Sequence, residues 1–276
     1  MSTQAEAKLA TAPLDFRLSL TFISPGQRAA QTALHAVYLE LREVPREVRD
    51  PGVADVKLRW WEEEIALLYA GKARHPLTQA LMPYMAALKG CQQAFLDLVT
   101  GARMDIAGAG LPAFEDVKRY SYRHSGALSE LSALLAGAGS EAALLSARLL
   151  GNAACLADIA SRGVAQALQG RLLFAAEDLR LHGIDKHIHG ETQGDPAVLA
   201  LVKDYGDRAR AMHADAIRST PVGERHALIP WRIRSTLALK RERKQEHAGS
   251  SRAAEPVELH PLSALFTAWN TARKSR

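Results

Sequence analysis

Three glutamates are spaced so that a helix would bring them onto one face. Glu40, Glu43 and Glu47 stand at intervals of three and four residues. Carboxylates at this spacing are neighbours on a helix surface, and Mg²⁺ prefers such oxygen ligands. A solvated face with arginine neighbours is the preferred interpretation, because Pro45 breaks the helix between Glu43 and Glu47 and no second acidic cluster faces them. Metal binding by these glutamates is the weaker hypothesis.

The densest basic run lies in the last long stretch with a helical pattern. It consists of Arg232, Arg234, Lys240, Arg241, Arg243 and Lys244, with Trp231 alongside. Such a run can meet anionic lipid headgroups or the phosphates of a nucleic acid. A solvated helix face is the commoner explanation and the preferred one. We therefore expect no nucleic-acid partner, while peripheral contact with a membrane stays open.

Length and composition are those of an ordinary globular protein. The chain has 276 residues, of which 47% are hydrophobic and 24% charged, with a net charge of +5. Two cysteines, Cys91 and Cys155, without a CxxC pattern argue against a disulfide framework and a structural zinc site. No apolar run reaches the ~18 residues of a membrane span, and the N-terminus lacks the pattern of a secretory signal. We expect a cytoplasmic protein, with a peripheral place at the inner membrane face as the open variant.

Hydrophobic periodicity predicts helices along the chain. From Pro25 to Val44 apolar residues recur every three to four positions, which is typical of one buried helical stripe. Further helices are expected at about 53–69, 77–89, 114–136, 141–163, 196–216 and 224–243. Alternating strands bounded by Asn-Gly or Asp-Gly turns are absent from the sequence. The predicted fold class is all-α.

The same pattern predicts one domain with loosely ordered ends. Residues 1–12 are small and polar, so a disordered N-terminus is expected there, followed by a helical domain over 13–243. Residues 244–258 have the composition of a linker. Residues 259–276 are expected to form a short helix that docks on the body. One face of that helix carries Leu262, Leu265, Phe266 and Trp269.

Several segments, taken in order, resemble the motifs of one protein family. They are Ile23-Ser24-Pro25 to Arg28, Ala36 to Arg42, Leu58 to Trp61 with His75-Pro76, Ala102 to Asp105, Tyr120 to Gly126, Leu150 to Ala153, Gly170-Arg171 and Glu177 to Leu179. Their order and spacing resemble the squalene/phytoene synthases, which join isoprenoid units head to head. The resemblance covers about residues 16–216. It implies a single-domain isoprenoid synthase helical bundle around a central cavity.

The resemblance breaks at the positions that would bind metal. The family's chemistry ionises a prenyl diphosphate, and Mg²⁺ held between two D-x-x-x-D helices neutralises the leaving group. The first motif is replaced here by Pro45, Arg46 and Arg49, and the second by Asp158, Ser161, Arg162 and Gln166. No D-x-x-x-D occurs anywhere in the chain. The sequence therefore predicts no metal site and no cofactor.

The leading hypothesis is a catalytically silent member of this fold that binds an isoprenoid, a prenyl-diphosphate-like molecule or a partner protein. The segments Glu40 to Val44 and Arg59 to Trp61 resemble a divergent branch that includes mitochondrial complex I assembly factors, in which the aspartate motifs are also eroded. That resemblance implies a role in respiratory complex assembly. The candidate ligand contacts are Tyr38, Arg42, Arg46, Arg49, Trp61, Tyr120, Tyr122, Arg162 and Arg171.

Two further interpretations belong beside this hypothesis. Arg46, Arg49 and Arg162 stand at former metal positions, where guanidinium groups could bind a phosphate without Mg²⁺. The alternative function is an active Mg²⁺-dependent prenyltransferase that condenses prenyl diphosphates. It would use the unconventional carboxylates Glu40, Glu43, Asp105 and Asp158. For the aromatic candidates, ordinary core packing is the competing explanation.

Overall fold

The computed structural model describes residues 3–108, 110–185, 187–190, 193–248 and 255–275. Within these ranges every regular element is a helix and no strand occurs. The all-α prediction is confirmed. The elements are α1 (Thr3–Ala10), α2 (Leu14–Ser19), α3 (Pro25–Glu47), α4 (Pro51–Tyr69), α5 (Pro76–Leu81), η1 (Met82–Leu88), α6 (Gln92–Ala107), α7 (Phe114–Ser121), η2 (Tyr122–Gly126), α8 (Ala127–Leu135), α9 (Glu141–Leu168), α10 (Ala176–Leu181), α11 (Pro196–Ser219), η3 (Val222–Leu228), α12 (Ile229–Ala248) and α13 (Pro261–Lys274).

Proline and capping residues set where the helices begin. A proline opens α3, α4, α5, α11 and α13, where its missing N–H costs no helical hydrogen bond. The Asp50 side chain accepts the Val53 N–H at 2.8 Å at the start of α4, and Ser140 accepts the Ala143 N–H at 3.1 Å at the start of α9. Local sequence therefore accounts for the starts of six helices, α3, α4, α5, α9, α11 and α13.

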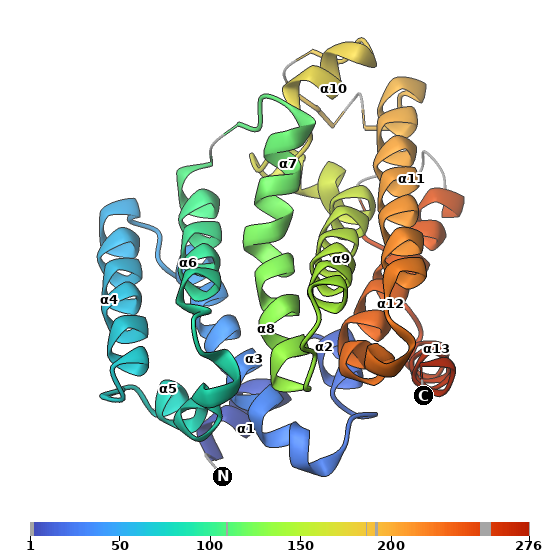
Figure 1. Ribbon diagram of the computed structural model, residues 1–276. Helices are drawn as coiled ribbons and strands as arrows, with labels where there is room; N and C mark the ends of the chain where they lie inside the picture. Colours follow the sequence, from blue (N-terminus) through green and yellow to red (C-terminus); the bar gives the residue numbers. More distant parts are fainter. Residues whose placement is uncertain (1–2, 109, 186, 191–192, 249–254, 276) are drawn as a thin grey trace.

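Helix α9 lies in the middle of the bundle, with α8 on one side and α11 and α12 on the other (Figure 1). Its alanines at positions 143, 147, 154, 157 and 160 are buried and leave room for the neighbouring helices to approach. Among the described residues, α9 is the one helix whose length and apolar composition suit a membrane span, yet 61% of that apolar window is buried inside the bundle. Its central position accounts for this composition.

Two glycines allow α6 and α9 to approach the turn that links α7 to α8. This turn, η2, is π-helical, a rare geometry that often marks functional sites. A Cβ atom on Gly101 would lie 2.6 Å from the Arg123 carbonyl oxygen, and one on Gly151 would lie 2.5 Å from that of Ser125. Neither position has room for a larger residue. The close packing fixes the side chains of η2 against α6 and α9.

Two expectations about the N-terminal third are corrected. The disordered tail expected at residues 1–12 is wrong for the part described, because α1 packs on α3 and buries Ala5. Residues 1 and 2 lie outside the described residues. The helix break expected at Pro45 is also wrong, since α3 continues to Glu47. A proline in the last turn removes one backbone hydrogen bond, and packing of the helix offsets this loss.

Other differences lie where the sequence pattern was weak or ambiguous. Helix α6 was not predicted, although it carries Asp105. The expected linker at 244–258 begins with the last turn of α12, and residues 249–254 lie outside the described residues. The Lys244 Nζ donates to the Glu258 carbonyl oxygen at 2.9 Å, so the far end of this segment lies against α12.

Helix α13 does dock on the body, but through its small residues. Ala264, Ala268 and Ala272 are buried against α12 and α2. The larger apolar side chains, which the pattern placed on one face, point outward. The exposed fractions are 69% for Leu262, 42% for Leu265, 64% for Phe266 and 45% for Trp269.

Candidate functional site

The carboxylate of Asp105 joins four segments that are far apart in the sequence. It lies on α6 and accepts hydrogen bonds from Arg42 of α3 and Arg171 of the segment after α9. The hydroxyl of Tyr120, on α7, donates to Asp105 at 2.9 Å, and Arg171 Nη2 donates to that hydroxyl at 2.6 Å. We call these four residues the Asp105 cluster. It includes three of the predicted ligand contacts and one of the alternative carboxylates.

The Asp105 cluster is buried except at Arg171, which is half-buried, and it carries a net positive charge. The side chains of Arg42 and Asp105 are only 6% and 4% exposed. Burial alone would lower the pKa of Arg42, but Asp105 and the nearby tyrosines raise it above its ordinary value. Burial, and then the Asp105 charge, raise the pKa of Tyr120, so its hydroxyl stays a neutral donor. Two guanidinium groups thus face one carboxylate.

An aromatic layer covers this cluster. Tyr38 of α3 stacks on Phe16 of α2 with ring centroids 5.7 Å apart, and His124 lies 5.3 Å from the Tyr120 ring. Burial lowers the pKa of His124 well below its ordinary value, and the charges of Arg42 and other arginines lower it further. His124 is therefore neutral near pH 7. His124 lies within the π-helical turn η2.

Arg234 of α12 brings a further positive charge to the aromatic layer. Its guanidinium carbon lies 3.5 Å from the centroid of the Phe16 ring, and the residue is 5% exposed. The Nε and Nη1 atoms of Arg234 are buried and have no hydrogen-bond partner among the described residues. The nearest carboxylate oxygen, on Asp15, lies 3.8 Å from Nε. Donors without acceptors at a buried position favour an anion or a polar ligand.

A second cluster of charges lies at the junction of α9, α12 and the segment before α13. Arg162 Nη2 donates to Glu258 at 2.7 Å, and Arg241 Nη1 donates to Asp158 at 2.7 Å. Both arginines line a pocket of about 260 Å³, which we call the Glu258 pocket. The Nε atoms of both arginines are buried without a hydrogen-bond partner in the part of the chain that the structure describes. Glu258, which is 66% exposed at its side chain, thus lies where an anion could bind.

The three glutamates of α3 line a groove of about 400 Å³ with Trp60, Trp61 and His75. Because α3 continues through Pro45, Glu47 stays on the same helix as the other two. Lys8 of α1 holds this site: its Nζ lies 2.6 Å from Glu40 and also bonds to Glu43. Two of the three glutamates, Glu40 and Glu43, are therefore paired with a cation of the chain. The described residues contain no group of three or more His, Cys, Asp and Glu side chains fit to hold a metal ion.

The remaining candidates lie apart from the Asp105 cluster. Tyr122 points to a different network, in which its hydroxyl lies 3.4 Å from Glu130. Arg46 is exposed but near enough to depress the pKa of His124. Arg49 is exposed and makes no hydrogen bond or ion pair with any described residue. Trp61 is 4% exposed, as the competing explanation of core packing requires, whereas its neighbour Trp60 is 44% exposed.

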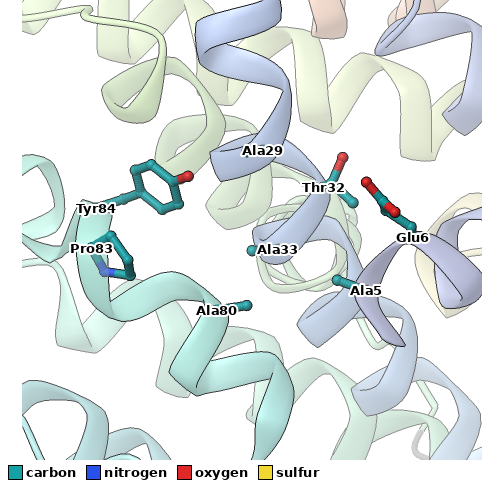
Figure 2. Close-up of a pocket in the computed structure, with 8 residues that line it drawn as sticks. All are labelled: Ala5, Glu6, Ala29, Thr32, Ala33, Ala80, Pro83 and Tyr84. Carbon is teal, nitrogen blue, oxygen red and sulfur yellow. The ribbon is translucent and has the colours of Figure 1, made fainter. Parts of the chain in front are cut away.

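A small pocket of about 230 Å³ between α1, α3 and η1 contains none of the predicted residues (Figure 2). Alanines form much of its wall, and Tyr84 and Glu6 face it from opposite sides in Figure 2. The residues lining it include one carboxylate and no cation. Its composition does not suit a phosphate ligand.

Sequence reasoning missed several residues that shape these sites. Arg234 and Arg241 belong to the basic run that was interpreted as a solvated face, and that interpretation is wrong for them and for Arg232, which is 8% exposed. Their spacing of seven residues, with Leu237 between them, was the available signal for a shared buried face. Arg243, by contrast, is exposed. The ion pairs made by Lys8 and Glu258 could not be predicted from the local sequence, because each joins segments that are far apart in the chain.

Comparison with known proteins identifies the family. A profile described as squalene/phytoene synthase matches residues 12–259. The chain belongs to the squalene/phytoene synthase family. It is 26% identical over 230 residues to the 15-cis-phytoene synthase of Synechocystis, an alignment that covers 78% of this chain and 67% of the relative. It is 25% identical over 242 residues to phytoene synthase 3 of Zea mays, covering 82% of this chain and 54% of that protein.

Solved structures agree on the fold of this family member. A dehydrosqualene synthase with a bound ligand superposes with a TM-score of 0.75 at 17% identity, covering 98% of this chain and 93% of that one. Squalene synthase HpnC from Alicyclobacillus acidocaldarius gives a TM-score of 0.75 at 18% identity, covering 88% and 93% of the two chains. The isoprenoid synthase fold is therefore confirmed. The chain aligns with 35% to 67% of the length of the phytoene synthases that it matches.

The residues of this family member do not fit a cluster of Mg²⁺ ions. Each alternative carboxylate already bonds to a cation of the chain: Asp105 to Arg42 and Arg171, Asp158 to Arg241, and Glu40 and Glu43 to Lys8. A metal ion would have to displace these partners before it could bind.

Acid should destabilise the protein through His35, which lies beneath Phe16. Burial lowers its pKa to about 3; the bond to the Gln31 carbonyl opposes this shift, and the charge of Arg234 adds to it. The unfolded state binds a proton below its ordinary pKa of about 6.5 and the folded state does not. The free energy of unfolding should therefore fall by about 1.4 kcal/mol per pH unit between about pH 6.5 and 3.

Urea unfolding at pH 7.5 and pH 5.0 measures this contribution. The substitution His35→Gln keeps a donor for the Gln31 carbonyl and should remove about 2 kcal/mol of the acid-induced loss. His247→Gln is the matched control, since His247 also contacts the carbonyl four residues earlier but is exposed. An equal pH dependence in the wild type and His35→Gln would contradict the prediction.

Proposed function

We propose that this protein is a catalytically degenerate member of the squalene/phytoene synthase family that binds an isoprenoid or lipid-like ligand, or a partner protein, without Mg²⁺. The observation that carries the proposal is the pairing of every alternative carboxylate with an arginine or lysine of the chain. Mg²⁺-assisted ionisation needs carboxylates that are free to hold the ions and a net negative site. Here the same region presents an excess of guanidinium groups.

The chemistry of these groups favours an anionic head on the ligand. Arg234 offers buried donors beside the aromatic layer, and Arg162 with Arg241 lines the Glu258 pocket. Guanidinium groups bind phosphate through paired charge-assisted hydrogen bonds. A prenyl diphosphate or a similar lipid phosphate combines such a head with an apolar chain. The proposed role ends at binding, because the carboxylates that would have to hold Mg²⁺ for ionisation are already paired with cations of the chain.

A role in the assembly of a respiratory complex is the finer part of the proposal. It rests on the resemblance of residues 40–44 and 59–61 to the assembly-factor branch, together with the eroded metal positions. Deleting the gene should then lower NADH:quinone oxidoreductase activity in isolated membranes. An unchanged activity and an unchanged amount of assembled complex would leave this finer part unsupported.

Calorimetric titration with farnesyl diphosphate, with and without Mg²⁺, tests the binding function. We expect binding that needs no Mg²⁺ and no release of diphosphate in a parallel assay. Mg²⁺-dependent release, abolished by Glu43→Ala, would contradict the proposal and support an active prenyltransferase. Absence of binding in both conditions would leave the partner protein as the proposed ligand, to be sought by pull-down with the full chain.

A further inference from the structure

Helix α13 presents its large apolar side chains to solvent and its small ones to the protein. At about 100° per residue, Leu262, Leu265, Phe266, Trp269 and Arg273 fall within an arc of about 100°. We call these five residues the outer face of α13. The four apolar ones are each at least 42% exposed. Single exposed apolar residues are ordinary, but four that adjoin on one helix form a patch that needs a partner.

The helix is held so that this face cannot turn inward. Ala268 of α13 is fully buried against core residues of α12 and α2. On another side, Lys240 Nζ donates to Ser263 Oγ at 2.8 Å and to Thr267 Oγ1 at 2.7 Å. A rotation of α13 would break these bonds and force larger side chains into a space that alanine fills. Figure 1 places α13 at the margin of the bundle, beside α12.

The charges on α13 itself have one sign. Residues 259–275 include Arg273 and Lys274 but no aspartate or glutamate. The Arg273 guanidinium carbon lies 5.4 Å from the Trp269 ring centroid, and the Phe266 and Trp269 rings are 5.8 Å apart. Leucine, phenylalanine and tryptophan beside basic residues are typical of helices that lie in the interface of an anionic bilayer.

We propose that the outer face of α13 binds the surface of a bilayer that contains anionic lipids. The apolar side chains would enter the headgroup boundary while Arg273 and Lys274 meet lipid phosphates. A symmetric pair of protein copies on this face is less suitable, because it would bring the same two cations together with no carboxylate of α13 to pair them. The membrane contact thus belongs to α13, whereas Arg232, Arg234 and Arg241 of the basic run are buried.

Vesicle flotation with the full chain tests this proposal. The wild type should bind vesicles of phosphatidylcholine with a third phosphatidylglycerol, and bind at least ten-fold more weakly to phosphatidylcholine alone or in high salt. The double substitution Phe266→Ser with Trp269→Ser should lower binding to anionic vesicles at least ten-fold. The matched control is Val53→Ser with Val56→Ser, two exposed apolar residues of α4, which should bind as the wild type does.

Three results would overturn the proposal that α13 binds a bilayer. Equal binding by the wild type and the α13 double variant, or no binding by the wild type, would overturn the proposal. So would a dimer in sedimentation velocity that the double variant loses, since a second copy would then cover the face. Circular dichroism and thermal unfolding check that the double variant is folded. As both positions face solvent, we expect little change in stability, and Arg273→Gln provides a second variant that leaves the apolar side chains intact.

Discussion

Replacing Asp105 by asparagine is expected to lower the free energy of unfolding by about 3–5 kcal/mol. The substitution keeps the shape of the side chain but removes its charge. Arg42, which is 6% exposed at its side chain, would then remain buried with no counter-ion. Arg171, at 31%, can recover some hydration, so most of the loss should come from Arg42. Urea unfolding followed by circular dichroism measures the change.

Two further variants separate the loss of the buried pair from a general effect of charge. Asp215→Asn removes a carboxylate from an exposed pair with Arg218 and should cost at most about 1 kcal/mol. Arg42→Met combined with Asp105→Leu removes both buried charges and should recover much of the stability, because an apolar pair needs no desolvation of ions. A loss below about 1 kcal/mol for Asp105→Asn would mean that the carboxylate is not required to hold the arginines.

Motif spacing predicted the Asp105 cluster in part. Arg42, Tyr120 and Arg171 were each selected from a different segment, and the structure brings them together on one carboxylate. Spacing predicts these residues because each motif lies on a helix or next to one. The apolar residues of that helix indicate which of its sides faces the protein interior. Tyr122 shows the limit of the method. It lies two residues from Tyr120, and the π turn that begins there directs its hydroxyl to Glu130.

Contacts between distant segments could not be predicted from spacing. Lys8 reaches Glu43 across 35 residues, and Arg162 reaches Glu258 across 96. No periodicity links such pairs, since their approach depends on how whole helices pack. Helix α13 makes the same point differently: the pattern indicated its apolar face correctly but could not indicate that alanines would face the core.

Opposite substitutions in the Glu258 pocket should shift ligand affinity in opposite directions. This prediction rests on the proposed binding of a prenyl diphosphate, with farnesyl diphosphate as the probe. Arg162→Ala removes a charge-assisted donor and should weaken binding about 10- to 100-fold, equivalent to about 1.5–3 kcal/mol. Glu258→Gln removes the carboxylate that competes with the ligand. Its half-exposed pair with Arg162 contributes about 0.2–1 kcal/mol, so affinity should rise by up to about five-fold.

Titration without Mg²⁺ distinguishes this pocket from the region near the Asp105 cluster. Arg46→Ala and Arg49→Ala test the other two arginines at former metal positions, which share no contact with Arg162 among the described residues. Glu63→Gln, at an exposed position of α4, controls for the loss of one negative charge. The Glu258 pocket does not hold the diphosphate if two results are found together. Glu258→Gln and Glu63→Gln would have equal affinity for farnesyl diphosphate, and Arg162→Ala would have the affinity of the wild type. A loss confined to Arg46→Ala would instead place the diphosphate beside His124, because Arg46, unlike Arg49 and Arg162, is one of the arginines whose charge lowers the pKa of His124.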